Sequence, residues 1–311
     1  MIERDDIEAA AARIAPHVRH TPLWVLRSDA LGLPGAAFEV WLKLEQLQAS
    51  GSFKARGMFN RLLANDIPAA GVIAASGGNA GIATAVAARA LGVRAEIFVP
   101  TVISPAKRAR LEQLGASVVV TGAVYADAFA ACQQRQRETG ALMTHAYDQR
   151  EVLAGAGTLA REIEQQAGVP DALLVSVGGG GLVGGLAAWF AGRTRVVALE
   201  PERAPTLNAA LAAGAPVDVE VSGVAADALG ARRIGALAWA VAQRHPMESL
   251  LLRDADILDA QRWLWQSLKL AVEPAAALPL AALRSGAVTA KPGQRIALVL
   301  CGANVDPATL V

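Results

Sequence analysis

The hydrophobic positions of this chain fall into short runs separated by longer, alanine-rich segments. Strands are predicted for the apolar runs Val72–Ala75, Val93–Val99, Ser117–Thr121, Ala172–Val177, 195–199 and Arg295–Leu300. Helices are predicted over residues 80–91, 104–114, 124–138, 151–167 and 182–191, with Ser104 capping the second of them. Strands that alternate with helices of about ten to fifteen residues indicate βαβ units and a parallel sheet. Beyond residue 200 the pattern is less regular until the last strand.

Two uncharged runs, Ile67–Ala88 and Ala172–Gly192, are long enough to span a membrane. Each run has glycines near its middle, however. Such a backbone would leave N–H and C=O groups unsatisfied in lipid. We therefore predict a strand, a glycine loop and a buried helix in each run, and no membrane association.

The composition narrows the class of protein. A chain of 311 residues has room for about two domains, and 53% hydrophobic with 18% charged residues excludes an intrinsically disordered chain. The net charge of +1 offers no electrostatic basis for nucleic-acid binding. Cys132 and Cys301 are the only cysteines, which excludes a disulfide framework and a structural zinc site. The charged N-terminus is unlike a secretory signal, so a cytoplasmic protein is expected.

Residues that could bind a ligand or react with it follow the ends of three predicted strands. Ser76–Asn79, Gly178–Gly181 and Cys301–Asn304 each follow a strand directly. Ligands of parallel α/β sheets bind beyond the carboxyl ends of the strands. The three segments are therefore expected to meet in one crevice.

The glycine tract Gly178–Gly181 follows a strand and opens a helix. Successive N–H groups and the positive helix end favour an anion such as phosphate, whereas the plain alternative is a tight turn. Gly179–Gly184 also fits GxGxxG, and Glu200 follows at the end of the next strand. This pattern keeps open a dinucleotide site, and with it an NAD-dependent oxidoreductase.

Two further segments carry polar groups of interest. Lys54 follows Phe53 and the small residues 49–52; an amine against an apolar wall has a lowered pKa and becomes nucleophilic. The alternative is a surface lysine in a loop. Ser76–Gly81 offers hydroxyl, amide and N–H groups for a carboxylate or phenolate oxygen, or it is a capping turn in which Asn79 caps the helix.

Taken together, five motifs resemble the fold-type II pyridoxal-phosphate enzymes, specifically the serine/threonine dehydratase family. They are Ser50–Gly57, Ser76–Gly81, Ser176–Leu182, Val272–Pro274 and Cys301–Asn304, and the resemblance runs from Thr21 to Val305. It implies an α/β fold like that of the tryptophan synthase β chain, with two open parallel-sheet domains and the cofactor in the cleft between them. The small domain is expected over 47–148, and the large domain over 1–46 and 149–311.

The resemblance also implies a role for each matching residue. Lys54 matches the lysine that binds pyridoxal 5'-phosphate as a Schiff base and then takes the substrate Cα proton. The other cofactor-binding matches are Phe53 beside the ring, Asn79 at its 3' oxygen, Cys301 at its nitrogen, and Gly178, Gly179, Gly180, Gly181 and Leu182 at the phosphate. Ser76, Gly77, Asn79 and Ala80 match the loop that binds the substrate carboxylate.

The implied activity is β-elimination from L-serine and/or L-threonine, giving pyruvate or 2-oxobutyrate and ammonia. A neutral thiol at the ring nitrogen suits elimination, because it leaves the ring a weaker electron acceptor than a carboxylate would. Related racemases have a serine where this chain has Gly77, so racemisation is not expected. The alternatives are a lyase for another 3-hydroxy amino acid of the hydroxyaspartate or phenylserine type, replacement chemistry like that of threonine synthase, and a non-catalytic binding protein.

Three further expectations come from the resemblance. Glu200, Ala204 and Thr206 match a region where the family binds a monovalent or divalent cation; the alternative is a surface acid at a strand end. The chain ends at Val311 without the regulatory domain of the biosynthetic enzymes, as in the catabolic type, so no isoleucine feedback is expected. A homodimer is usual in the family.

Overall fold

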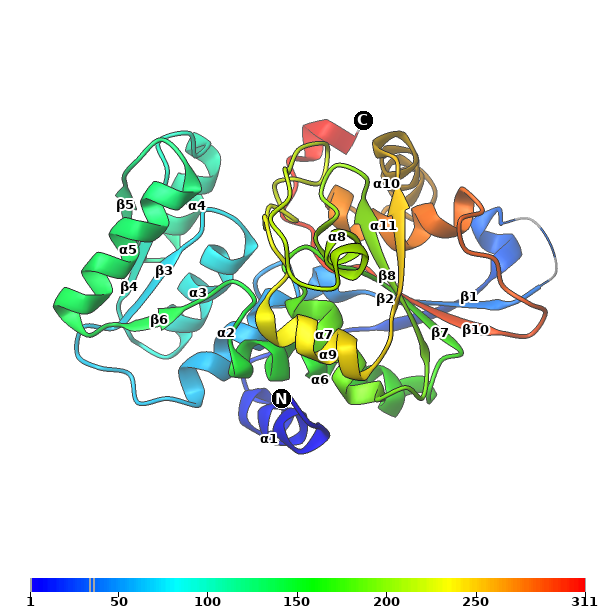
Figure 1. The fold of residues 1–311 in the computed structure, drawn as a ribbon, viewed down its shortest axis with the longest axis horizontal. Helices are drawn as coiled ribbons and strands as arrows, with labels where there is room; N and C mark the ends of the chain where they lie inside the picture. The colour runs from blue at the N-terminus through cyan, green and yellow to red at the C-terminus, as the bar shows by residue number, and fades with distance from the viewer. Residues whose placement is uncertain (1, 34, 36, 311) are drawn as a thin grey trace.

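The computed structural model describes residues 2–33, 35 and 37–310. Two α/β units lie side by side, each built around its own sheet (Figure 1). The larger sheet has the strand order β1-β2-β10-β7-β8-β9, and the smaller has the order β5-β4-β3-β6. In both sheets, strands distant in sequence are neighbours, so the loops that follow them are brought together.

The larger sheet is parallel except at one edge. Its strands are β1 (Leu23–Arg27), β2 (Glu39–Lys43), β7 (Ala172–Ser176), β8 (Arg195–Pro201), β9 (Glu248–Leu252) and β10 (Arg295–Val299). β1 pairs antiparallel with β2, with Leu23 opposite Lys43, which departs from the expected all-parallel sheet. The short connection between them, which contains the 3₁₀ turn η1 (Ser28–Leu31), has no room for the crossover that a parallel pair needs.

The smaller sheet is wholly parallel. It consists of β3 (Val72–Ala75), β4 (Ala95–Val99), β5 (Ser117–Val120) and β6 (Leu142–Thr144). Its helices are α2 (Lys54–Leu63), α3 (Asn79–Ala90), α4 (Pro105–Gln113) and α5 (Tyr125–Thr139). Along β3, Val72 and Ala74 pack in the cluster with α2 and α3, while Ile73 and Ala75 pack in the cluster with α5. Burial on both faces explains why these strands are continuous apolar runs.

The predicted helices are confirmed to within a residue or two. α3, α4 and α5 lie over the segments predicted at 80–91, 104–114 and 124–138, and α6 (Arg150–Ala167) and α7 (Gly181–Phe190) over the next two. The Ser104 hydroxyl accepts the Lys107 N–H at 3.3 Å, as expected of an N-cap. After residue 200 come α8 (Thr206–Ala213), α9 (Ala236–Arg244), α10 (Asp254–Leu268) and α11 (Pro274–Arg284), which the irregular pattern did not separate.

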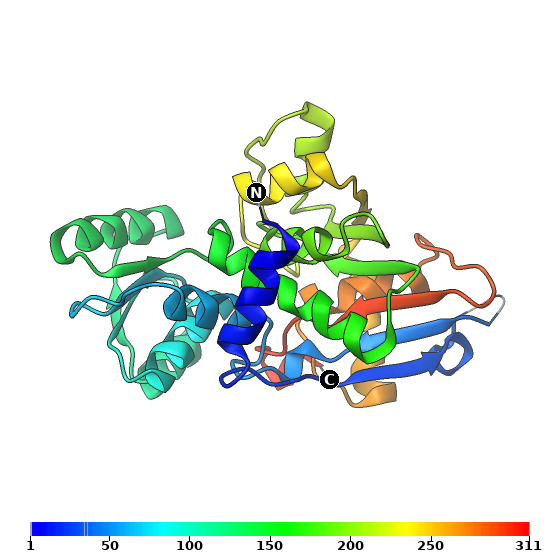
Figure 2. The same cartoon turned by 90° about the horizontal axis from the view of Figure 1, so that it is seen from below.

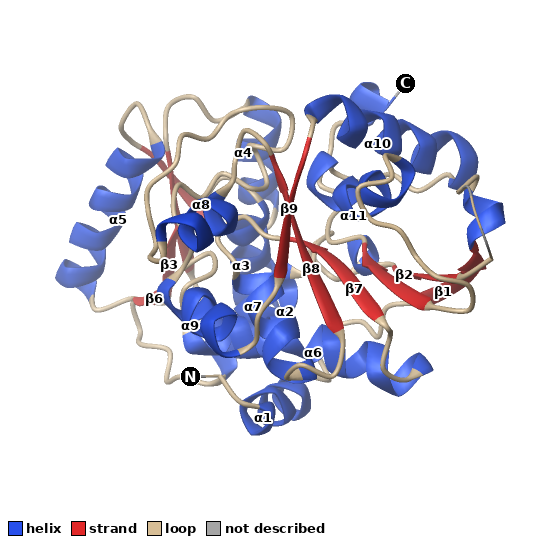
Figure 3. Cartoon of the chain, turned by 45° about the vertical axis from the view of Figure 1, so that its right-hand side comes forward, coloured by secondary structure: helices blue, strands red, loops and turns tan. Residues whose placement is uncertain are grey.

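Helices cover both faces of the larger sheet. Figure 3 shows α6 and α7 on one face and α10 and α11 on the other. The N-terminal helix α1 (Arg4–Ile14) packs against α6 and α2, where the two units meet (Figure 2). The short turns η2 (Glu45–Leu47) and η3 (Pro307–Leu310) complete the chain.

The two uncharged runs form strands, loops and buried helices, as predicted. The first contains β3 and most of α3, and the second contains β7 and α7. Within residues 2–33, 35 and 37–310, no helix is both long and apolar enough to cross a membrane.

A buried cluster of charged side chains joins the two units. Lys43 Nζ lies 2.5 Å from Glu162 Oε1, and Arg56 Nη2 lies 2.9 Å from Glu162 Oε2. The Arg56 Nε also lies 2.6 Å from Glu45 Oε1. Arg56 and Lys43 are the two largest fully buried side chains among the described residues. Since Arg56 lies in the first turn of α2, the cluster fixes the start of that helix against β2 and α6.

Candidate active site

The sheet order places three of the sequence motifs next to one another. β10 lies between β2 and β7, so the segment after β10 is flanked by the segments that follow its two neighbours. The Phe53 N–H donates to the Cys301 carbonyl at 3.0 Å. Asn304 Nδ2 donates to the Ser50 carbonyl at 3.1 Å, and Ser52 forms a bridge with Gly302. The segment that precedes Lys54 and the segment Cys301–Asn304 therefore lie against each other at these strand ends.

Lys54 is the first residue of α2, and its side chain points inward. Its Nζ donates to the Ala146 carbonyl at 2.6 Å and lies 4.9 Å from the centroid of the Phe53 ring. Burial lowers the pKa of Lys54 to about 8, against the opposing effects of Cys301 and Glu273. The alternative of a surface lysine is wrong. A neutral, nucleophilic amine is accessible near physiological pH.

The glycine tract turns sharply from β7 into α7. Gly178 and Gly180 have φ of +59° and +84°, which side chains rarely adopt. A Cβ on Gly179 would lie 2.3 Å from the Tyr147 ring, and one on Gly180 would lie 2.5 Å from Ala238 Cβ. The tract therefore requires glycines, and it presents bare backbone at the N-terminus of a helix, where anions bind.

Asn79 takes part in a side-chain network between the units. Its Nδ2 donates to the Glu273 oxygens at 3.0 and 2.8 Å, and its Oδ1 accepts from Asn304 Nδ2 at 2.5 Å. The Asn304 N–H donates to Glu273 Oε1 at 2.8 Å. The alternative in which the Asn79 side chain caps α3 is wrong, because Gly78 occupies the N-cap position and no side chain caps the helix.

Glu273 belongs to the motif Val272–Pro274, and the sequence by itself indicates no role for it. It lies at the N-cap of α11, is 5% exposed, and accepts from both Asn79 and Asn304. Burial raises its pKa, against these hydrogen bonds. The local signal for Glu273 is an acidic residue directly before Pro274, which opens a helix. Its partners Asn79 and Asn304 lie too far away in sequence to be inferred.

Cys301 is buried at the end of β10. Burial raises the pKa of its thiol strongly, and the neighbouring Glu273 adds to the effect. The thiol is therefore neutral over the physiological range. A neutral group at this position can form a hydrogen bond with a ring nitrogen without stabilising a charge on it.

The loop from Ser76 to Ala80 connects β3 to α3. The Gly78 N–H donates to the Ser76 hydroxyl at 3.3 Å, which folds the loop back on itself. A Cβ on Gly77 would lie 3.0 Å from Ile103 Cδ1, so an isoleucine side chain occupies the space beside it. The loop ends at the N-terminus of a 12-residue helix, a position that favours a carboxylate.

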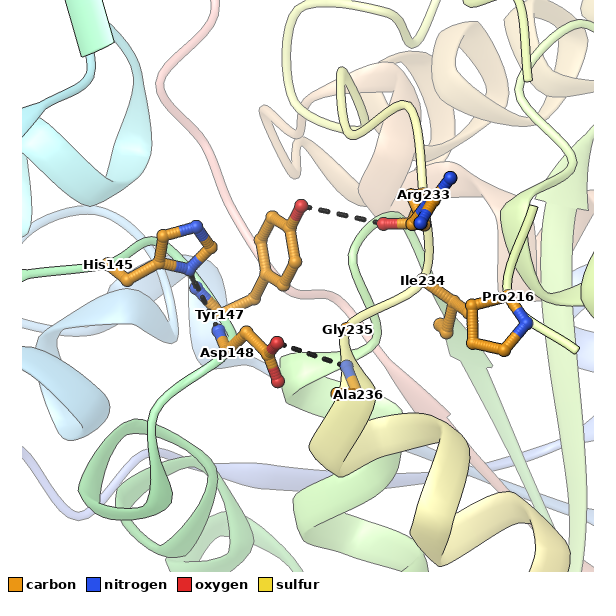
Figure 4. A pocket seen from close by; sticks show the side chains of 8 residues that line it. All are labelled: His145, Tyr147, Asp148, Pro216, Arg233, Ile234, Gly235 and Ala236. Atoms are coloured by element: carbon orange, nitrogen blue, oxygen red, sulfur yellow. Dashed lines mark hydrogen bonds between the residues drawn. The ribbon is translucent and has the colours of Figure 1, made fainter. Parts of the chain in front are cut away.

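A pocket of about 390 Å³ lies beside the glycine loop (Figure 4). Tyr147 stands at its centre, with its ring 4.6 Å from the His145 ring and its hydroxyl donating to the Arg233 carbonyl at 3.4 Å. Asp148 accepts the N–H groups of Ala236 and Leu237, both at 3.0 Å. Sequence reasoning missed Tyr147, since no glycine or charge marks it.

The three residues matched to a cation lie behind the glycine loop and are fully buried. Glu200 Oε1 accepts the Leu207 N–H at 2.9 Å, and Oε2 accepts the Asn208 N–H at 2.8 Å. Burial raises the pKa of Glu200 against these bonds. The alternative of a surface acid is wrong, because Glu200, Ala204 and Thr206 are 0% exposed. Across the described residues, no three His, Cys, Asp or Glu side chains gather as a metal site.

The residues present fit pyridoxal phosphate. Lys54 supplies an amine with a lowered pKa, and the glycine loop offers bare backbone N–H groups at a helix start. Asn79 and Cys301 are polar side chains of the kind that would hold a ring oxygen and a ring nitrogen. Lys54 is linked to the glycine loop through two neighbouring residues. Ala146 accepts its hydrogen bond, and the next residue, Tyr147, packs its ring against Gly179.

Comparisons with known proteins identify the family of the chain. A model of the pyridoxal-phosphate dependent enzyme family matches residues 14–302. The chain is 36% identical to a phenylserine dehydratase of Ralstonia pickettii, over 98% of this chain and 94% of that protein. It is 35% identical to an L-threonine ammonia-lyase of Geobacter sulfurreducens, over 98% of this chain and 76% of that protein.

Solved structures show the same fold. The structure of maize serine racemase matches with a TM-score of 0.91 and 30% identity, covering 99% of this chain and 95% of that chain. A threonine deaminase from T.th. matches with a TM-score of 0.88 and 35% identity, covering 98% of this chain and 99% of that chain. These matches remove the support for a dinucleotide site at Gly179–Gly184. The chain therefore belongs to the fold-type II pyridoxal-phosphate dependent enzymes, as a lyase of the branch that contains the threonine dehydratases.

Proposed function

We propose that the protein eliminates water from L-serine and/or L-threonine, and so forms pyruvate or 2-oxobutyrate and ammonia. The observation that carries the proposal is the position of Lys54, whose part-buried amine lies between the Phe53 ring and the Ala146 carbonyl, while the next segment against Phe53 carries the neutral thiol of Cys301. This combination provides a base for the Cα proton and a weakly polarising partner for a ring nitrogen.

Bound pyridoxal phosphate supplies an aldehyde that condenses with amines and a ring that accepts electrons from Cα. Lys54 is the group that binds that aldehyde. With cofactor and substrate bound, the Lys54 Nζ would be the group that takes the Cα proton, and it would do so in its neutral form. The β-hydroxyl leaves with a proton as water, and the resulting enamine takes up one water to give the 2-oxo acid and ammonia.

The Ser76–Ala80 loop is proposed to bind the substrate carboxylate. Its backbone N–H groups lie at the start of α3, where the helix dipole favours an anion. The loop is joined to the rest of the site by Asn79, which Glu273 orients.

The glycine tract is proposed to bind the cofactor phosphate. Gly178–Gly181 lies at the N-terminus of α7, where backbone N–H groups bind anions, and Leu182 follows as a buried residue of that helix. We further propose that residues 47–148 form a smaller domain and that 1–46 and 149–311 form the larger one. A salt bridge from Lys107 of α4 to Asp227 joins these proposed domains.

Racemisation is a second candidate, because a serine racemase shares the fold. Two observations disfavour it. Gly77 has no side chain that could donate a proton, and Ile103 occupies the neighbouring space. We therefore expect L-serine to yield 2-oxo acid without D-serine. Chiral chromatography of the remaining serine tests this, and D-serine formed as fast as the 2-oxo acid would contradict it.

The experiment that tests the function measures 2-oxo acid release by the cofactor-loaded protein. The substrates are L-serine, L-threonine, their D-forms and L-threo-phenylserine, with Lys54→Ala as the matched inactive variant. Release from L-serine or L-threonine that disappears in the variant is the expected result. Release only from phenylserine would keep the elimination but reassign the substrate, as the similarity to a phenylserine dehydratase allows.

A further inference from the structure

Both oxygens of Glu200 are already hydrogen-bonded, so the one acidic side chain matched to a cation has other partners. Both carboxylate oxygens accept backbone N–H groups from the first turn of α8. These N–H groups carry the positive end of the helix dipole, which repels a cation. A hard cation such as Mg²⁺ or Ca²⁺ needs about six to eight oxygen ligands. Here one carboxylate, already bound by N–H groups, is the only acidic side chain among the three matched residues.

Thr206 is one of the three residues matched to a cation, and its hydroxyl contacts protein oxygens on two sides. Its Oγ1 is 2.5 Å from the Gly178 carbonyl oxygen and 2.9 Å from Glu200 Oε1. It therefore connects the first glycine of the loop to the end of β8. Thr206 and Glu200 are both fully buried, so water does not compete for these contacts.

We propose that Thr206 is a positioning residue for the phosphate site, and that its hydroxyl makes a bound cation unnecessary. The proposal rests on the assignment of Gly178–Gly181 as that site. It is independent of which amino acid the enzyme uses.

A contact on the β8 side of the loop can orient an N–H group on the opposite side, because both groups belong to one peptide plane. The Gly178 carbonyl and the Gly179 N–H belong to one planar trans peptide and point in opposite directions. When Thr206 fixes the carbonyl on the β8 side, the Gly179 N–H is directed to the other side of the loop. The Gly179 carbonyl is fixed as well, because it accepts the Gly235 N–H at 3.1 Å. The Gly179 N–H is thus held in one orientation before any anion binds.

The test compares pyridoxal phosphate with pyridoxal, which lacks the phosphate. Dissociation constants for both are measured on the apo protein for wild type, Thr206→Val and Thr206→Ser. The matched control is Thr194→Val, which removes another buried hydroxyl-to-carbonyl bond, at the start of β8. We expect Thr206→Val to weaken pyridoxal phosphate roughly tenfold, the equivalent of one hydrogen bond, and to leave pyridoxal unchanged. Thr206→Ser and Thr194→Val should retain wild-type affinity for both.

Each outcome decides the proposal. Equal weakening of both compounds by Thr206→Val would show a merely structural role and overturn it. If wild type binds the two compounds equally well, the loop is not the phosphate site, and the proposed function loses that assignment too. Should Thr206→Val fail to fold, wild type still decides: after chelation and exchange into a buffer free of K⁺, adding K⁺, Mg²⁺ or Ca²⁺ should not change the affinity for pyridoxal phosphate. A saturable increase with any of these cations would overturn the proposal.

Discussion

The buried charge cluster makes a quantitative prediction for the variant Arg56→Met. Arg56 contacts both Glu45 and Glu162, and its side chain is 2% exposed. Lys43 is the second cation of the cluster, with a fully buried side chain. Two cations and two carboxylates give a neutral group. Arg56→Met keeps most of the side-chain volume but leaves one negative charge in excess.

The expected loss of stability follows from that excess charge. Removing one partner of a buried ion pair costs about 3–5 kcal/mol, because the remaining charge stays desolvated. Since domains are stable by only about 5–15 kcal/mol, this is a large fraction of the total. A matched surface pair is Arg161 and Glu8, with side chains 29% and 48% exposed. Arg161→Met is expected to cost at most about 1 kcal/mol.

Urea unfolding of the apo protein at neutral pH measures both variants. Replacing Glu45 with Gln in the Arg56→Met background restores neutrality, and we expect it to recover part of the loss. A deficit for Arg56→Met no larger than that for Arg161→Met would refute the reasoning. So would a double variant that is less stable than Arg56→Met alone.

The pH dependence of that deficit has a defined sign. Burial alone would raise the pKa of Glu162, but Arg56 and Lys43 hold it below its ordinary value of 4.5. The stability from this depressed pKa is fully present above pH 4.5 and is lost as the pH falls through the native value. The gap between wild type and Arg56→Met should therefore be constant near neutrality and narrow in acid. A gap that widens in acid would contradict this account.

Three further predictions concern the site. Because Lys54 must be neutral to react, its rate of pyridoxal-phosphate incorporation, followed by absorbance, should rise about tenfold per pH unit below its pKa of about 8 and then level off; a flat profile would contradict this. Gly81→Ala would place a Cβ 1.9 Å from the Ser76 carbonyl oxygen. We therefore expect the free energy of unfolding in urea to fall by about 1–3 kcal/mol and KM to rise, whereas unchanged values would show that the loop shifts freely. Glu273→Ala leaves the Asn79 amide without its acceptor, so catalysis and stability should both fall, whereas Glu273→Gln keeps an acceptor and should retain most of both; equal effects in the two variants would argue against a hydrogen-bonding role.

The sequence alone determined the features that depend on local signals. The strand and helix segments up to residue 200 follow from hydrophobic periodicity, which neighbouring residues impose directly. The glycine tract was equally visible, because positive φ at Gly178 and Gly180 demands glycine whatever surrounds it. The motif around Lys54 identified the reactive amine. The residues of that motif could not show that the amine is part-buried in the folded chain.

Only the tertiary structure decided which distant groups meet. Asn79 and Glu273 are 194 positions apart, and their contact depends on how the two units pack. Thr206 reaches Gly178 because β8 lies beside β7. The buried Arg56 contacts Glu45 and Glu162, which come from different elements and meet only in the folded chain. No local pattern encodes a strand order such as β2-β10-β7, because that order is selected by the packing of whole layers. The chemistry of each segment was therefore readable from its residues, whereas the partner of each polar group was not.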